Sequence, residues 1–381
     1  MSVASPLLDH CPPTLPARAY LDPTWFEAER RLIFAREWLP AGEVDGFPDG
    51  IIRRVEAAGA SVIVLRDEMG LRAFHNVCRH RGAELCSAET APLRGRRITC
   101  PYHAWSYASD GRLLSTAFGT PTADFRKEDN GLLPVALKLW NGFVFLCLSE
   151  SPPEFAPDIG VGALDNWPMD RLVVGHRAET TIACNRKTFW DNYNECLHCP
   201  GVHPQRSDRV PAYARGIMSS AESPETAGRP GPVYADGAET WTVSGRPCGP
   251  PFEGLTAEER AAGHIFVTLY PAMFVVAHID HVRAVMLTPV STETTQLTAL
   301  WLFPPATLAR PGFDLGDVIG FASTVIAEDA AACEMNQRGL RSPAYTSGRL
   351  MPQEFDIARF HRWVTERLGA EATCVRPEGK T

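Results

Sequence analysis

The chain has 381 residues, of which 45% are hydrophobic and 22% are charged, and its formal net charge is −8. These values are typical of a globular protein with one large domain or two smaller ones, and the acidic balance argues against nucleic acid as the main partner. No apolar run reaches the roughly 18 residues of a membrane helix, and the N-terminus does not resemble a signal peptide. The eleven Cys form no tight, even framework. We therefore expect a cytoplasmic protein without membrane segments or a disulfide scaffold.

The first half of the chain changes pattern twice. A helix is expected over residues 23–37, where Pro stands at the start and apolar residues recur at helical spacing. From residue 38 to 149, short β runs alternate with Gly and Pro, and Asp110-Gly111 is typical of a hairpin turn. The Pro-rich stretch 150–160 predicts a linker.

The second half has an α+β pattern. A helix is expected over residues 189–199, ended by Pro200-Gly201, and a long loop region is expected over 205–262. Strands are expected at 265–269, 273–278, 283–287 and 296–303. Helices are expected at 317–338 and 356–368.

Two stretches of the β region each combine one Cys with one His, namely Cys78-Arg79-His80 and Cys100-Pro101-Tyr102-His103. Two thiolates and two imidazoles fit a [2Fe–2S] cluster that has Cys on one iron and His on the other. A Cys2His2 zinc site would use the same atoms. Zinc fingers pair Cys with Cys and His with His, so the mixed pairs favour the cluster.

A second motif, NYNECLHCPGVHP, places Glu195, His198 and His203 within nine residues. Two His and nearby carboxylates are the ligands of a mononuclear non-haem Fe(II) site. On a regular helix His198 and His203 would lie about 140° apart. Pro200-Gly201 must therefore distort the chain if both His bind one metal. The alternative is two unrelated His on an amphipathic helix.

Three further features have competing interpretations. Cys196 and Cys199 have the spacing of a redox or zinc pair, but two buried thiols are favoured because the intervening His198 is needed for iron. His278 and His281 are expected on opposite faces of a strand, where they cannot share a metal. A basic cluster is either solvated loop charge or a docking patch for an acidic ferredoxin. Its members are Arg79, Arg81, Arg94, Arg96 and Arg97.

The strings NVCRHRG, ITCPYHAWSY and NYNECLHCPGVHP together resemble the large (alpha) subunits of Rieske non-haem iron oxygenases. Within this family, the residues of the last motif are most similar to those of the branch that contains the glycine betaine, stachydrine and carnitine oxygenases and the N-dealkylases. Two departures are visible: Ala104 stands where Gly is usual, and the nineteen residues between His80 and Cys100 are slightly more than relatives lead us to expect.

This resemblance covers essentially the whole chain and implies an α+β protein with two domains. An all-β Rieske [2Fe–2S] domain would occupy residues 38–160. A helix-grip catalytic domain, an antiparallel sheet with a long C-terminal helix, would occupy residues 161–381. The N-terminal segment 1–37 would complete the catalytic domain.

The resemblance also implies roles for single residues. The ligands of the [2Fe–2S] cluster would be Cys78, His80, Cys100 and His103. The ligands of mononuclear Fe(II) would be His198, His203 and Asp329. Glu328 is the alternative carboxylate ligand. Glu195 would hydrogen-bond both His198 and the His103 of a neighbouring subunit, which makes it an inter-subunit electron bridge.

The implied activity is that of the oxygenase component of a multi-component monooxygenase. Electrons from NAD(P)H would arrive through a separate flavin reductase, with or without a ferredoxin, because the chain has neither a GxGxxG motif nor a plant-type four-Cys run. The co-substrates would be O₂ and a small organic molecule. A head-to-tail ring is required if the electron bridge crosses subunits, and the resemblance implies that this ring is a homotrimer.

The resemblance to the glycine betaine, stachydrine and carnitine oxygenases implies N-dealkylation. In this reaction, hydroxylation of a carbon attached to nitrogen gives a carbinolamine, which collapses to an aldehyde and a dealkylated amine. Phe266, Tyr270 and Phe274 could contribute an aromatic cage for a quaternary ammonium. The apolar stretch 265–277 suits a neutral N-alkyl amide, such as a chloroacetanilide herbicide, equally well. The alternatives are an aromatic-ring hydroxylating dioxygenase of aromatic hydrocarbon catabolism and an O-demethylase. A non-catalytic electron carrier is disfavoured because it would not need the second motif.

Overall fold

The computed structural model describes residues 6–217 and 234–369, and the chain divides into two compact units. One unit comprises residues 30–155, and the other combines residues 1–29 with 156–381. The boundaries expected from the sequence stand at residues 37 and 160. Within the described ranges, no helix is both long and apolar enough to cross a membrane.

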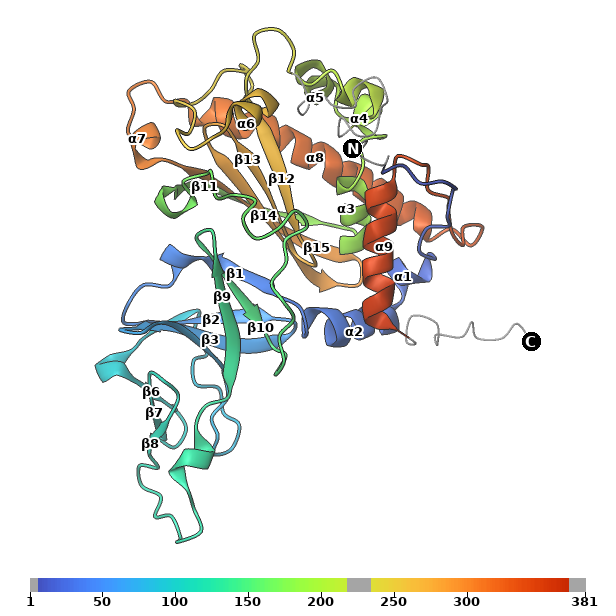
Figure 1. The fold of residues 1–381 in the computed structure, drawn as a ribbon. Helices are drawn as coiled ribbons and strands as arrows, with labels where there is room; N and C mark the ends of the chain where they lie inside the picture. The colour runs from blue at the N-terminus through green and yellow to red at the C-terminus, as the bar shows by residue number, and fades with distance from the viewer. Residues whose placement is uncertain (1–5, 218–233, 370–381) are drawn as a thin grey trace, which may run out of the picture. The chain divides into compact units, whose positions relative to one another are not determined.

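The unit of residues 30–155 is built on a seven-stranded antiparallel sheet in the order β1-β10-β9-β4-β3-β2-β5 (Figure 1). The strands are β1 (Leu39–Glu43), β2 (Ile51–Ala57), β3 (Ala60–Asp67), β4 (Gly70–His75), β5 (Thr90–Pro92), β9 (Pro134–Trp140) and β10 (Phe143–Cys147). The short helices are η1 (Arg30–Phe34), η2 (Val44–Gly46), η3 (Arg94–Arg96) and η4 (Lys127–Asn130). Every residue of β10 is buried, so this apolar run forms the middle of the core.

A smaller sheet in the same unit carries one of the two loops of the first motif, and the larger sheet carries the other. Its order is β6 (Arg97–Thr99), β7 (Ser106–Ala108) and β8 (Leu113–Ser115). The predicted hairpin at Asp110-Gly111 is confirmed, because this turn joins β7 to β8 and Gly111 has a φ of 88°. One loop of the motif follows β4 and the other follows β6.

The other unit has a five-stranded antiparallel sheet in the order β11-β15-β14-β13-β12. Its strands are β11 (Val173–Ile182), β12 (His264–Leu269), β13 (Met273–His278), β14 (Val282–Ser291) and β15 (Thr294–Phe303). The four predicted strands are confirmed as β12 to β15. The sequence analysis missed β11, whose many polar residues give no apolar run.

The helices of this unit include the two that the sequence predicted near the C-terminus, α8 (Leu315–Leu340) and α9 (Phe355–Leu368). Helix α3 (Arg186–Tyr193) packs against both of them, and Figure 1 shows α9 alongside α3. The remaining helices are α1 (Arg18–Leu21), α2 (Pro23–Glu29), η5 (Met169–Arg171), α4 (Cys199–Val202), α5 (Pro204–Arg209), η6 (Tyr213–Arg215), α6 (Ala257–Ala262) and α7 (Pro305–Leu308).

The predicted helix over residues 189–199 is wrong. Helix α3 ends at Tyr193, and Pro200 and Gly201 lie inside the separate short helix α4 instead of ending a longer one. The break occurs because the Glu195 carboxylate accepts the backbone N–H groups of Leu197 and His198, which replaces helical hydrogen bonds with a turn. Proline is tolerated in the first turn of α4 because no helical acceptor exists there for its missing N–H.

A buried charge cluster joins the N-terminal helices to the start of α3. Glu29 lies 2.8 Å from the Lys187 ammonium and 3.5 Å from the Arg186 guanidinium, and all three side chains are buried. Burial lowers the pKa of Lys187 to about 8, although the Glu29 charge opposes the shift. Charges removed from water are stable only when they compensate one another. This cluster therefore fixes residues 18–29 to the helix that leads into the second motif.

Candidate metal centres

The structure brings the four residues of the first motif together. The Cys78 and Cys100 thiols are hydrogen-bonded to each other, and the ring centroids of His80 and His103 lie 4.8 Å apart. Both Cys side chains are buried, whereas His80 is exposed and His103 is half-buried. Two buried sulfurs and two accessible imidazoles form a donor set that fits a [2Fe–2S] cluster with its His-ligated iron toward the surface.

Neighbouring side chains hold these donors in place. The Trp105 ring stacks on His80, with centroids 4.8 Å apart and planes 9° apart. The Tyr107 hydroxyl lies 3.2 Å from the Cys78 sulfur, and burial raises the pKa of Tyr107 well above its usual value. The hydroxyl therefore keeps its proton, which it can donate to the sulfur. Ala104 has a φ of 57°, in the left-handed region that favours glycine, which explains why Gly is usual at this position.

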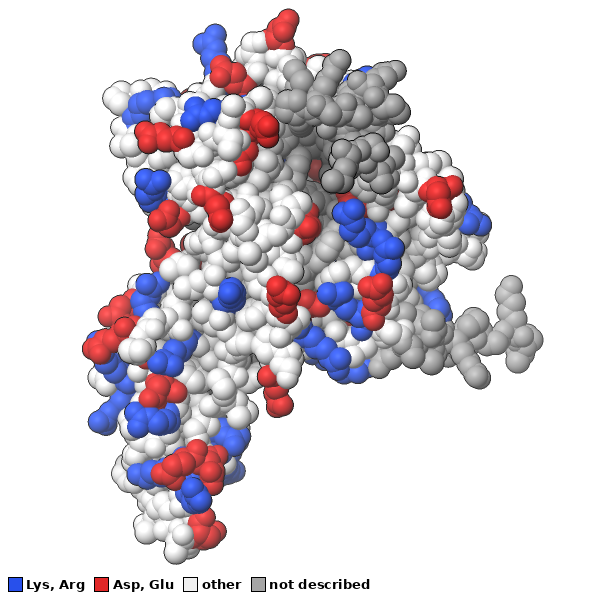
Figure 2. All heavy atoms as spheres, in the orientation of Figure 1, with Lys and Arg blue, Asp and Glu red and all other residues white. Residues whose placement is uncertain are grey.

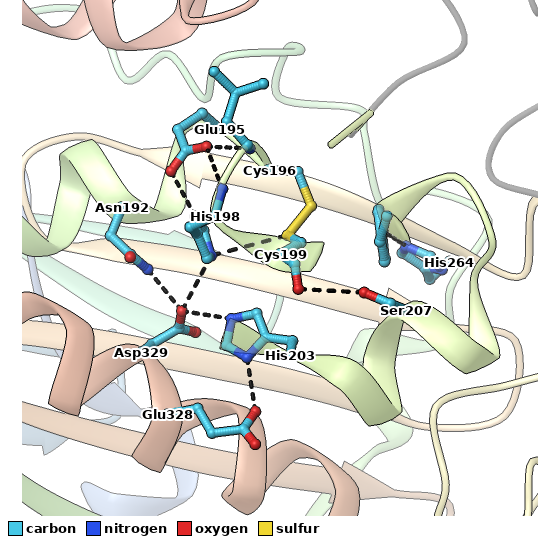
Figure 3. The surroundings of a disulfide bond; sticks show 12 residues. Asn192, Glu195, Cys196, His198, Cys199, His203, Ser207, His264, Glu328 and Asp329 are labelled. Carbon is cyan, nitrogen blue, oxygen red and sulfur yellow. Dashed lines mark hydrogen bonds and ion pairs between the residues drawn. A yellow bond between two sulfur atoms is a disulfide. The ribbon is translucent and has the colours of Figure 1, made fainter. Parts of the chain in front are cut away.

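The second motif forms a compact donor set with helix α8. His198, His203 and Asp329 each offer a ligand atom, and these atoms lie within 4.8 Å of one another. The Nε2 atoms of His203 and His198 lie 2.9 Å and 3.4 Å from the Asp329 Oδ1 atom (Figure 3). Two imidazole nitrogens and one carboxylate that converge on one point fit a 2-His-1-carboxylate iron site.

Each of the three donors has a second partner that orients it. Glu195 Oε1 bonds His198 Nδ1 at 2.5 Å, Glu328 Oε2 bonds His203 Nδ1 at 2.8 Å, and Asn192 donates to Asp329 Oδ1 at 2.7 Å. Such bonds fix the orientation of metal-binding His rings.

The position of Glu328 bears on the choice of carboxylate ligand. Glu328 bonds the ring nitrogen of His203 that faces away from Asp329, so it orients the ring instead of sharing the metal position. This geometry favours Asp329 over Glu328. The sequence analysis did not include Asn192, and its only signal was its place six residues before His198 in the same motif.

The electrostatics of the donor set favour a bound cation. Burial alone would lower the pKa of His198, but hydrogen bonds to Asp329 and Glu195 and their negative charges raise it to about 9. Burial alone would raise the pKa of Asp329, but its bonds with His198 and His203 hold it well below its usual value. The metal-free site therefore holds a proton on His198, and a divalent cation would displace it.

Cys196 and Cys199 form a disulfide bond beside this donor set (Figure 3). The prediction of two buried thiols is therefore wrong, although both residues are buried. Their Cα atoms lie 5.0 Å apart, because a turn brings residues three apart within bonding reach. The spacing C-x2-C alone does not distinguish a thiol pair from a disulfide.

The prediction that His278 and His281 lie on opposite faces of a strand is wrong. His278 ends β13 and His281 lies in the turn before β14, where the two rings stack at 4.4 Å. A second group of potential ligands lies here and comprises Cys248, Asp280 and His281. The Asp280 carboxylate already bonds the Thr240 hydroxyl (3.1 Å), the Cys248 N–H (2.6 Å) and the His281 ring (2.9 Å). We interpret Asp280 as an anchor that holds the loop of residues 240–248 to this turn.

The three candidate substrate-pocket residues separate into two groups. Phe266 and Phe274 lie on one face of the sheet, because Thr268 pairs with Phe274 and Phe266 is two residues before Thr268 on the same strand. The ring centroids of Phe266 and Phe274 lie 6.1 Å and 4.2 Å from that of Tyr193. Tyr270 lies in the turn after β12, and its hydroxyl donates to Asn194. Its ring packs on the rings of Trp190, Phe360 and Trp363.

The five Arg side chains of the basic cluster are all exposed. Arg96 pairs with Glu68, and Arg81 lies over the Tyr102 ring. On the face of the molecule that Figure 2 shows, basic and acidic side chains alternate over residues 30–155. The docking role of this cluster stays a prediction.

Comparison with known families identifies the protein family and the cofactors to which these two donor sets belong. The family described as "Ring hydroxylating alpha subunit (catalytic domain)" matches residues 169–370, and the "Rieske [2Fe-2S] domain" matches residues 37–126. The chain belongs to the Rieske oxygenase alpha subunits. It is an oxidoreductase of the Rieske oxygenase type, and its cofactors are a [2Fe–2S] cluster and a mononuclear iron. The predicted family, fold class, enzyme type and cofactors are confirmed.

The individual proteins that resemble this Rieske oxygenase share a modest fraction of its residues. The glycine betaine monooxygenase oxygenase subunit of Pseudomonas aeruginosa is 29% identical over 95% of this chain and 92% of that protein. The carnitine monooxygenase oxygenase subunit of Escherichia coli is 37% identical over 52% of this chain and 54% of that protein. A crystal structure of a quaternary ammonium Rieske monooxygenase with an inhibitor has a TM-score of 0.69 and 22% identity, covering 97% of this chain and 99% of that chain. This last likeness shows the fold.

Proposed function

We propose that this Rieske oxygenase is the oxygenase component of a multi-component monooxygenase that hydroxylates a C–H bond next to nitrogen and so removes an N-alkyl group. The substrate class that we favour is a quaternary amine, and the second candidate is a neutral N-alkyl amide. The observation that carries the proposal is the aromatic cluster of Tyr193, Phe266 and Phe274 on the helix and sheet that adjoin the second motif.

This aromatic cluster suits a cation better than an anion or a strongly hydrated group. Tyr193 is the last residue of α3, and the turn that carries His198 begins directly after it. Aromatic faces attract a quaternary ammonium through their negative quadrupoles, and the attraction grows when the cation is desolvated. The similar proteins that are named as glycine betaine and carnitine monooxygenases support the same class. The lack of a carboxylate within the cluster itself leaves the neutral amide as the second candidate.

The donor residues define what the chain contributes to the reaction. His198, His203 and Asp329 would hold the iron on one face, and the iron supplies the oxygen chemistry when it is bound. Glu195, Glu328 and Asn192 fix the orientation of these three donors. Tyr193 and the phenyl rings would hold the substrate and exclude water from its N-alkyl carbon. The hydroxylated carbon then loses the amine and leaves as an aldehyde.

Electron supply requires partners outside this chain. We infer that a flavin reductase, with or without a ferredoxin, delivers electrons from NAD(P)H to the cluster. Glu195 would connect the His103 of a neighbouring subunit with His198 in a homotrimer, and its bond to His198 Nδ1 supports the second half of that path.

A substrate panel tests this proposal. The purified protein with a surrogate reductase and NADH would be supplied with glycine betaine, carnitine, choline, an N-alkyl chloroacetanilide and naphthalene. We expect aldehyde and dealkylated amine from a quaternary amine, in a 1:1 ratio, and none from the Asp329→Ala variant. Aldehyde from the chloroacetanilide alone would favour the second candidate. A hydroxylated ring without any aldehyde would contradict N-dealkylation.

A further inference from the structure

We propose that Cys196 and Cys199 form a reversible thiol–disulfide switch that controls how tightly the adjacent site holds iron. The inference rests on the part of the proposed function that assigns His198 and His203 to the metal, and it does not depend on the substrate.

The disulfide closes a turn from which both metal-binding His residues extend. His198 lies inside the ring that the bond between Cys196 and Cys199 completes. The Cys199 carbonyl accepts the backbone N–H of His203 at 2.9 Å, so the position of His203 also depends on this turn. The Ser207 hydroxyl donates to the same carbonyl at 3.3 Å. A change in the bond between the two sulfurs therefore acts on both imidazoles.

The sulfur atoms also lie where an oxidant from the metal site would arrive. The Cys199 sulfur is 3.9 Å from His198 Nε2, which is the nitrogen that faces Asp329. Figure 3 shows the disulfide next to this ring, with a dashed line that joins the Cys199 sulfur to the ring. Both cysteines are buried, with 2% and 0% of their surface exposed, so large oxidants from solvent do not reach them.

The oxidant that we assign is hydrogen peroxide, the two-electron reduction product of O₂ and a molecule small enough to reach buried sulfurs. One cysteine sulfur attacks the O–O bond, and a sulfenic acid and one water form. The second sulfur then displaces the hydroxyl group as water and closes the disulfide, so that two thiols and one H₂O₂ give one disulfide and two H₂O. A small reductant, such as a phosphine, returns the pair to two thiols.

A second close pair of cysteines in the same unit has not formed a disulfide and serves as a comparison. The Cys184 and Cys333 thiols are hydrogen-bonded to each other and buried, yet both are free. The hydrogen bond with Cys184, together with burial, raises the pKa of Cys333 well above its usual value. Cys184 and Cys333 come from segments far apart in the sequence and do not close a short turn around a metal-binding residue, so this pair is the control.

Reduction is expected to weaken iron binding. With two free thiols, the turn of residues 196–199 samples more conformations, and iron binding must then order it. The entropy of closing a loop of this length corresponds to roughly a tenfold weaker affinity. We therefore expect the dithiol form to release mononuclear iron about tenfold faster than the disulfide form, while the [2Fe–2S] cluster is unchanged.

Differential alkylation with mass spectrometry measures the state of each pair. Protein purified without reductant would be unfolded, alkylated, reduced and alkylated with a second label. We expect the second label on Cys196 and Cys199 and the first label on Cys184 and Cys333. After anaerobic treatment with a phosphine, one equivalent of H₂O₂ should restore the first pair only. The proposal would be overturned if Cys196 and Cys199 carried the first label both before and after treatment with peroxide.

Iron release to a colorimetric chelator measures the consequence. The wild-type protein would be compared in its oxidised and phosphine-reduced states, with Cys196→Ser and the control Cys184→Ser. Equal release rates from oxidised and reduced wild type would refute the switch, even if Cys196→Ser fails to fold. Neither readout requires turnover, so these results stand apart from those of the substrate panel.

Discussion

The carboxylate ligand of the iron can be identified with two substitutions on one helix. Within residues 6–217 and 234–369, Asp329→Ala removes the only carboxylate oxygen that faces both His198 Nε2 and His203 Nε2. Glu328→Gln changes a side chain that contacts only the opposite nitrogen of His203, at 2.8 Å. The neighbouring positions therefore test the two roles in nearly the same surroundings.

The expected sizes of the two effects differ because one residue would bind the metal and the other would orient a ligand. Loss of an orienting carboxylate costs about 10–100-fold in metal affinity, or roughly 1.4–2.7 kcal/mol. Loss of one of three protein ligands leaves too few donors to retain Fe(II). Asp329→Ala should thus hold about two irons per chain, both in the cluster, whereas Glu328→Gln should still reach about three when Fe(II) is in excess.

Anaerobic Fe(II) reconstitution followed by total iron analysis distinguishes these outcomes, with the visible cluster absorption as the internal standard. The reasoning would be refuted if Asp329→Ala kept its third iron while Glu328→Gln lost it. In that case Glu328 would be the carboxylate ligand of the iron.

Four more predictions follow from the other contacts. Cys100→Ser should abolish the iron–sulfur absorption, whereas Cys86→Ser, a buried free cysteine of the same unit, should keep it; equal spectra would contradict the cluster assignment. Glu195→Ala should keep the cluster and most of the mononuclear iron, yet rapid-mixing spectroscopy with O₂ and substrate should show slow reoxidation of the cluster; loss of one iron per chain would instead indicate a ligand. Iron affinity measured by equilibrium dialysis should rise about tenfold per pH unit from pH 6.5 to 8.5, because His198 has a raised pKa of about 9 in the metal-free protein and must lose its proton, and a flat profile would argue against this. The same shift means that the metal-free protein loses stability as pH rises through this range. Glu29→Gln should lower the free energy of unfolding by about 3–5 kcal/mol in denaturant titrations, because it removes the carboxylate that pairs with two buried cations, and a loss under 1 kcal/mol would show that water reaches them.

The two cofactor-binding motifs were predictable from the sequence because their chemistry is local. Each Cys–His pair of the first motif lies within four residues on one loop, so residue type and spacing already specify the donor set. The strands β12 to β15 and helix α8 were predictable for a similar reason, since apolar runs and helical periodicity are properties of neighbouring residues. The polar strand β11 lacks such a run, and only its pairing with β15 makes it a strand.

The remaining features depend on how distant segments meet. Asp329 and Glu328 are adjacent, and side chains one residue apart on a helix point about 100° away from each other. Only the rotation of α8 against the turn of residues 196–199 decides which of them faces both His rings. The break after Tyr193 depends on the Glu195 carboxylate folding back onto backbone N–H groups, and the same turn brings two cysteines within bonding distance. Periodicity assumes a regular element, so it fails where a side chain replaces the backbone as a hydrogen-bond partner.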